Sequence, residues 1–114
     1  MQITKKKFIL TILIFTLAIA SVFSQEKKDA LKLYRNGNYA EAIKVCQEEI
    51  IEKPKNMDSY VVLCWSLVKN KQYSEAELWA KKGREISSYD QRIIEILGEA
   101  EYYLGKNSEA LSLF

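Results

Sequence analysis

The chain carries the stretch Gly37-Asn38-Tyr39-Ala40-Glu41-Ala42, and two related stretches follow it at a fixed distance. They are Lys71-Gln72-Tyr73-Ser74-Glu75-Ala76 and Gly105-Lys106-Asn107-Ser108-Glu109-Ala110, so each begins 34 residues after the one before (37, 71 and 105). A constant period of this length is typical of stacked copies of one supersecondary unit. The sequence therefore predicts a solenoid with repeats at residues 23–56, 57–90 and 91–114, the last of them truncated.

Each of these stretches predicts the end of one helix and the start of the next. Gly37 can adopt a positive φ without steric cost, which suits a helix C-terminus. Asn38 is a favoured N-cap residue, and Glu41 stands where the second partner of a capping box is found. Short loops make consecutive helices antiparallel neighbours. We therefore expect an all-α fold with helices at 26–36, 39–53, 57–70, 73–87, 91–104 and from 107 onward.

Over residues 26–114 the pattern resembles the tetratricopeptide repeat family. The middle repeat matches that family's large, small and aromatic positions at Tyr60, Leu63, Cys64, Leu67, Tyr73, Ala76 and Gly83. The chain departs from the family pattern where Lys71 replaces the turn glycine, where Asp29 and Glu101 replace apolar residues, and where Glu49 replaces a small one. The resemblance implies a right-handed helix-turn-helix solenoid of about two and two-thirds repeats, forming a domain over residues 25–114.

Residues 1–24 differ from the rest of the chain. Three lysines (Lys5, Lys6, Lys7) precede an uncharged run at 8–23, and residues 18–20 and 22–24 both offer small-residue cleavage patterns. This arrangement predicts a secretory signal peptide, cleaved after Ser24 or alternatively after Ala20. The run is shorter than the roughly twenty residues of a membrane-spanning helix, although an uncleaved anchor remains an alternative. We therefore expect an exported, periplasmic or otherwise extracytoplasmic protein that meets the membrane only through this segment.

Composition argues against several classes of function. The chain has no histidine, so Ser–His and Cys–His nucleophiles are excluded. Without Lys5–Lys7 the remainder holds 17 − 3 = 14 basic and 15 acidic residues, which is no basic excess for nucleic acid. Cys46 and Cys64 are expected to be buried hydrophobes, with a disulfide as the weaker alternative. We expect no enzyme activity, no cofactor and no metal.

The resemblance also implies where a partner binds, because the first helix of each repeat lines the concave face in that family. The positions concerned hold Tyr34, Arg35, Val61, Trp65, Lys69, Arg92 and Tyr102. We expect the three aromatic residues among them to form one strip, with the cations at its rim. Trp, Tyr and Arg are the residues that dominate interface hot spots. The expected partner is therefore a protein or peptide segment with apolar side chains.

These features predict an exported, non-catalytic scaffold for protein–protein interaction in bacterial envelope assembly, secretion or transport. Two alternatives stay open. The repeats could be the targeting module of a longer envelope enzyme, since Leu111 and Phe114 have no following helix to cover them and we expect the chain to continue. The same uncovered residues could instead mediate self-association.

Overall fold

The structure is a computed structural model that describes residues 28–113, so the predicted signal peptide at 1–24 lies outside the described residues. The described part of the chain is all-α, as predicted. It contains six helices: α2 (Ala30–Arg35), α3 (Tyr39–Glu52), α4 (Met57–Lys69), α5 (Tyr73–Ile86), α6 (Gln91–Tyr103) and α7 (Asn107–Leu113).

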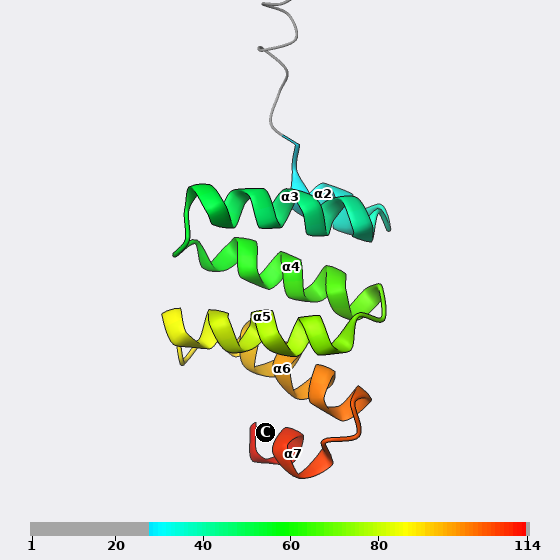
Figure 1. Ribbon diagram of the computed structural model, residues 1–114, viewed down its shortest axis with the longest axis vertical. Helices are drawn as coiled ribbons and strands as arrows, with labels where there is room; N and C mark the ends of the chain where they lie inside the picture. Colours follow the sequence, from blue (N-terminus) through cyan, green and yellow to red (C-terminus); the bar gives the residue numbers. More distant parts are fainter. Residues whose placement is uncertain (1–27, 114) are drawn as a thin grey trace, which may run out of the picture.

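The helices stack one after another in chain order (Figure 1). In addition α2 contacts α4, and α4 contacts α6, whereas within residues 28–113 α3 does not contact α5, nor α5 α7. The first helices of the three hairpins therefore form a continuous inner layer, and α3, α5 and α7 form an outer layer. A stack whose inner helices approach one another more closely is concave on the inner side.

The three turns inside the hairpins have one geometry. Gly37, Lys71 and Gly105 adopt positive φ angles of 80°, 61° and 79°. In each turn the following N–H donates to a carbonyl five residues earlier, as from Asn38 to Leu33 at 2.8 Å. These are the left-handed residue and the long bond of a Schellman motif. The period of 34 residues in the sequence is thus a period in space.

The expected capping box is wrong. Neither Asn38 nor its equivalent Gln72 makes a side-chain cap hydrogen bond. Asn38 has a ψ of 63°, outside the extended region that an N-cap residue usually adopts, because it also closes the Schellman turn. Glu41 forms an ion pair with Lys28 instead of returning to the backbone.

Side-chain caps occur at the inner helices instead. Asp29, Asn56 and Asp90 have extended backbones and accept hydrogen bonds from the first turns of α2, α4 and α6. Asp29 accepts from the N–H groups of Leu31 and Lys32 at 3.1 and 3.3 Å. This cap explains why α2 begins at Ala30 rather than at the predicted residue 26.

The core lies between the two layers and is centred on α4. Its largest fully buried side chains are Leu63, Leu67, Ile93, Leu97, Val61, Cys46, Cys64 and Ser66. Both cysteines are free and buried, as expected, and burial raises the pKa of each thiol to about 12. Neither thiol ionises near neutral pH, so both act as small apolar residues in the core.

Candidate partner-binding surface

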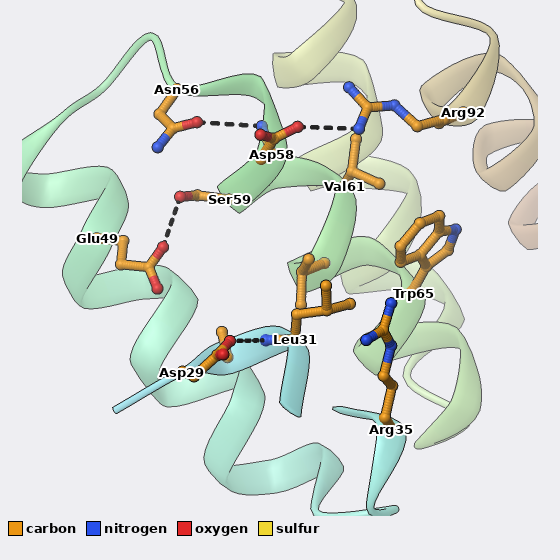
Figure 2. Close-up of a pocket in the computed structure, with 12 residues that line it drawn as sticks. Asp29, Leu31, Arg35, Glu49, Asn56, Asp58, Ser59, Val61, Trp65 and Arg92 are labelled. Carbon is orange, nitrogen blue, oxygen red and sulfur yellow. Dashed lines mark hydrogen bonds and ion pairs between the residues drawn. The ribbon is translucent and has the colours of Figure 1, made fainter. Parts of the chain in front are cut away.

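The inner layer is hollowed where α2, α4 and the start of α6 meet. This inner hollow has a volume of about 390 Å³ and is bordered by Asp29, Ala30, Leu31, Arg35, Glu49, Asn56, Asp58, Ser59, Val61, Val62, Trp65 and Arg92. Most of these side chains come from the first helices of the three hairpins, and they are drawn in Figure 2. Four of the seven predicted groove residues therefore border one hollow: Arg35, Val61, Trp65 and Arg92.

The floor of the inner hollow is apolar. Figure 2 shows Leu31 and Val61 directed toward the same space, with the indole of Trp65 beside them. Val61 is fully buried, so it belongs to the core beneath the hollow and not to its exposed surface. Trp65 is half-buried, and its ring stacks on Tyr34 with centroids 5.7 Å apart and planes inclined by 29°. The indole is thus held by a ring contact with α2.

The carboxylates around the inner hollow are already bound within the protein. Asp29 caps α2, and Glu49 accepts a hydrogen bond from the hydroxyl of Ser59 at 2.8 Å. Asp58 accepts from Nη1 of Arg92 at 2.9 Å. Glu49 occupies a position at which the family pattern has a small residue, and its bond to Ser59 joins α3 to α4. That departure from the pattern is therefore explained by a contact between two repeats.

Arg92 joins two repeats as well as bordering the hollow. Its Nη2 donates to Asp90 at 2.7 Å and its Nη1 to Asp58, which stands 34 residues earlier. The side-chain hydrogen bond from Arg92 is the main cause that holds the pKa of the Asp90 carboxyl below its ordinary value. Arg92 therefore borders the inner hollow while its guanidinium also links α6 to α4.

The other two rim cations are not engaged in this way. Arg35, at the end of α2, is exposed, and its guanidinium has no partner among residues 28–113. Lys69, at the end of α4, is also exposed, and no carboxylate of the described chain pairs with its ammonium group. Both cations are therefore available to a ligand of the inner hollow or of the surface beside it.

The expected single strip of aromatic residues is split in two. Tyr102 does not join the Tyr34–Trp65 pair but makes an edge contact with Tyr103, whose ring stacks on Tyr73 at 4.6 Å. Tyr102 borders a second hollow of about 550 Å³, the edge hollow, formed by Gly98, Glu99, Tyr102, Tyr103, Asn107, Ala110 and Leu111. Tyr34 and Tyr102 occupy equivalent positions of the first and third repeats, and the middle repeat has the buried Val68 at that position.

No group of three or more His, Cys, Asp or Glu side chains in residues 28–113 is arranged to hold a metal ion. None of the described helices is both long and apolar enough to cross a membrane.

Comparison with known proteins bears on the fold. No protein-family model matches this sequence, and no curated protein does either. Among solved structures, the chain is similar to SycD, the type III secretion translocator chaperone of Yersinia enterocolitica, crystallised as an alternative dimer. The two share 23% sequence identity and a TM-score of 0.71 over 74% of this chain. The fold is of the tetratricopeptide-repeat type. The match covers 64% of SycD, which is less than two thirds of its length.

Proposed function

We propose that this protein is a non-catalytic interaction module that holds a segment of a partner protein in its inner hollow. The observation that supports this most directly is the half-exposed indole of Trp65 beside Leu31, with Val61 buried beneath them. A large aromatic side chain at the centre of an apolar depression is the usual composition of an interface hot spot. The rim is polar, and its carboxylates are satisfied, so a partner's apolar side chain can enter without leaving a buried charge unpaired.

Three considerations favour binding over catalysis. The chain lacks histidine, and the thiols of Cys46 and Cys64 are buried with raised pKa values. The carboxylates that border the inner hollow are bound to donors of the protein itself. The similar solved structure is that of a chaperone, which is a class of protein that acts by binding other proteins.

We further propose that the protein acts outside the cytoplasm, in envelope assembly, secretion or transport. The support is the basic and apolar pattern of residues 1–24, together with the likeness to a secretion chaperone. The test is fractionation of the source cells followed by N-terminal sequencing of the protein. A new N-terminus at Gln25 or Ser21 in the periplasmic fraction is expected, and an intact N-terminus in the cytoplasmic fraction would overturn this part of the proposal.

The binding proposal is tested by affinity capture with the full chain, followed by mass spectrometry and by titration of the captured protein. Trp65→Ala is expected to weaken that binding by about 2 kcal/mol, or roughly thirtyfold. Tyr89→Ala is the matched control, because Tyr89 is an exposed aromatic residue outside the inner hollow. Equal affinities for the two variants, with an unchanged circular dichroism spectrum, would show that the inner hollow is not the binding site.

Self-association is a second candidate function. It is favoured by the edge hollow, where Tyr102 and Leu111 are 64% and 74% exposed on one apolar surface. Exposed apolar patches of this kind often mark protein–protein contacts. Light scattering over a range of concentrations, with Leu111→Lys as the comparison variant, is the test. A monomer mass at every concentration for the unmodified chain would remove this candidate.

A further inference from the structure

The edge hollow corresponds to a surface that a helix covers in the middle hairpin. It lies between α6 and α7, at the end of the stack of described helices (Figure 1). The residues that stand 34 positions before Gly98, Tyr102 and Ala110 belong to α4 and α5, and all three are buried. The helix that packs on both α4 and α5 is α6. The edge hollow is therefore equivalent to a surface that receives a helix elsewhere in this molecule.

Helix α6 shows which apolar pattern such a surface receives. Four of its apolar residues expose no more than 2% of their surfaces, and they are Ile93, Ile96, Leu97 and Ala100. Their spacing of three, four and seven residues from the first places them on one face of the helix. An amphipathic helix with this spacing is therefore a better match to the edge hollow than an extended segment.

The edge hollow is acidic, and its charge is not balanced. Glu99 is the only charged residue among those that border it, and it forms no ion pair within the described chain. Residues 90–113 hold two basic and five acidic residues, a net charge of 2 − 5 = −3, whereas residues 28–89 have 11 − 9 = +2. The two basic residues of the acidic part, Arg92 and Lys106, are already paired with carboxylates. Charge complementarity therefore favours a basic partner at this surface.

We propose that the edge hollow binds an amphipathic helix of a partner protein that carries Lys or Arg beside its apolar stripe. This surface is separate from the inner hollow, so the proposal does not depend on the function assigned there. The apolar stripe covers Leu111 and one side of Tyr102, and the cation contacts the carboxylate of Glu99. A cation is also attracted to an aromatic face. The ring of Tyr102 is held in place by Tyr103, which stacks on Tyr73.

A symmetric contact with a second copy of the chain fits the charge less well. In a two-fold dimer each copy contributes the same surface to the interface. Two paired edge hollows would bring both Glu99 carboxylates to one interface, and no Lys or Arg borders either hollow to balance them. Like charges placed together across an interface are unfavourable. A partner with a basic helix avoids this repulsion.

The test uses the full chain and two labelled synthetic peptides, with binding followed by fluorescence anisotropy. Both peptides have the same length and the apolar spacing of α6, but the flanking positions hold Lys and Arg in the basic peptide and Glu in the acidic peptide. The unmodified chain is expected to bind the basic peptide about tenfold more tightly at low salt. This preference is expected to shrink at high salt, because Glu99 is exposed.

Four variants locate the site. Glu99→Lys is expected to weaken binding of the basic peptide about five- to tenfold and to strengthen binding of the acidic one. Glu48→Lys is the matched control, since Glu48 is exposed on α3, does not border the edge hollow and changes the net charge equally. Tyr102→Ala is expected to weaken both peptides roughly tenfold. Trp65→Ala is expected to leave both affinities unchanged, and circular dichroism checks that each variant is folded.

The outcomes that would contradict the proposal are distinguishable. Equal affinities for the two peptides, no binding of the basic peptide, or equal effects of Glu99→Lys and Glu48→Lys would remove the preference for a basic helix at this site. Loss of binding in Trp65→Ala but not in Tyr102→Ala would place the peptides in the inner hollow, which would leave the function proposed there intact. A dimer that neither peptide dissociates, and that Tyr102→Ala does dissociate, would show that a second copy covers the edge hollow.

Discussion

The middle and third repeats place very different side chains at the same buried position. Leu67 and Glu101 stand 34 residues apart in equivalent turns of α4 and α6, and both are buried, with 0% and 4% of their surfaces exposed. Each also stands four residues before the left-handed residue of its turn, which is Lys71 or Gly105. The backbone carbonyl of each accepts the long hydrogen bond of the Schellman motif. One position thus holds methyl groups in the middle repeat and a carboxyl group in the third.

The carboxyl group of Glu101 is poorly accommodated. Its Oε2 has no hydrogen-bond partner among the described residues. Burial raises its pKa first of all, and the nearby charge of Glu77 raises it further, although Lys81 and Lys106 act in the opposite direction. Lys106 donates to both oxygens of Glu77, at 2.9 and 3.0 Å, so its charge is shared. The repeat therefore determines where a side chain lies, while the residues packed around that side chain determine whether it stabilises the fold.

The largest expected effect comes from truncating Leu67, with truncation of Glu101 as the comparison. Leu67→Ala should lower the free energy of unfolding by about 2–5 kcal/mol, because it leaves a cavity in the core around α4. Glu101→Ala should lower it far less, since it also removes a buried carboxyl group without a full set of partners. Urea denaturation followed by circular dichroism measures both. Equal losses of unfolding free energy for the two variants would show that Glu101 contributes as much to stability as Leu67 does. The two repeats would then not differ at this position.

A second pair tests how tightly each hairpin is packed. Ala76 in α5 is fully buried, and the thiol of Cys64 lies 3.9 Å from its carbonyl oxygen. Ala76→Leu should therefore destabilise the protein by about 1–3 kcal/mol through overpacking. Its equivalent Ala110 borders the edge hollow, which can receive the added methyl groups.

Ala110→Leu should consequently change the unfolding free energy by less than Ala76→Leu, as measured in the same denaturation experiment. A neutral Ala76→Leu would mean that the two hairpin helices are not in close contact at this position. A large loss for Ala110→Leu would mean that α7 packs on α6 as tightly as α5 packs on α4.

Most of the fold could be predicted from the sequence, because it rests on local signals that repeat. Helices α3 to α6 end within one residue of their predicted limits, and the left-handed turn residues stand at the predicted spacing. The late start of α2 does not follow from the repeat pattern, which places Asp29 inside a helix, whereas Asp29 is the N-cap of α2. An acidic residue at an apolar repeat position was in fact the signal for a cap.

Less of the candidate site could be predicted. The period indicates which residues lie on the inner layer, and four of them do border one hollow. It does not indicate that Arg92 binds Asp58, or that Tyr102 pairs with Tyr103 rather than joining Trp65. Those contacts depend on side-chain reach between neighbouring repeats, which a single-sequence pattern does not contain. Whether these residues bind a partner stays a prediction.

A smaller effect is expected from neutralising the buried carboxyl group. The pKa of Glu101 is raised in the folded state above its ordinary value of 4.5, so the folded protein binds this proton more tightly than the unfolded chain. Its contribution to stability is therefore present below pH 4.5 and is lost as the pH rises through the folded-state pKa. Glu101→Gln keeps the shape of the side chain and removes this loss of stability at higher pH.

At neutral pH the Glu101→Gln variant should be more stable than the unmodified protein by about 1 kcal/mol. The difference should decrease as the pH is lowered toward 4.5. Carboxyl groups with lowered pKa values, such as Asp90, give the opposite pH dependence but are common to both proteins. Denaturation midpoints at a series of pH values measure the difference, and a difference independent of pH would show that Glu101 titrates normally.

The smallest expected effect concerns the hairpin turn. There the middle repeat, and not the third, has the less favourable residue for the backbone conformation. Lys71 adopts a φ of 61°, whereas the equivalent Gly37 and Gly105 adopt similar angles as glycines. A residue with a Cβ in this conformation is strained by roughly 1–2 kcal/mol, and glycine is not. Glycine also adds entropy to the unfolded chain, which offsets part of the gain. Lys71→Gly should therefore stabilise the protein by about 0.5–1 kcal/mol, seen as a higher denaturation midpoint, while Gly105→Ala should lower that midpoint. A lower midpoint for Lys71→Gly would show that contacts of the lysine side chain outweigh the strain of its backbone.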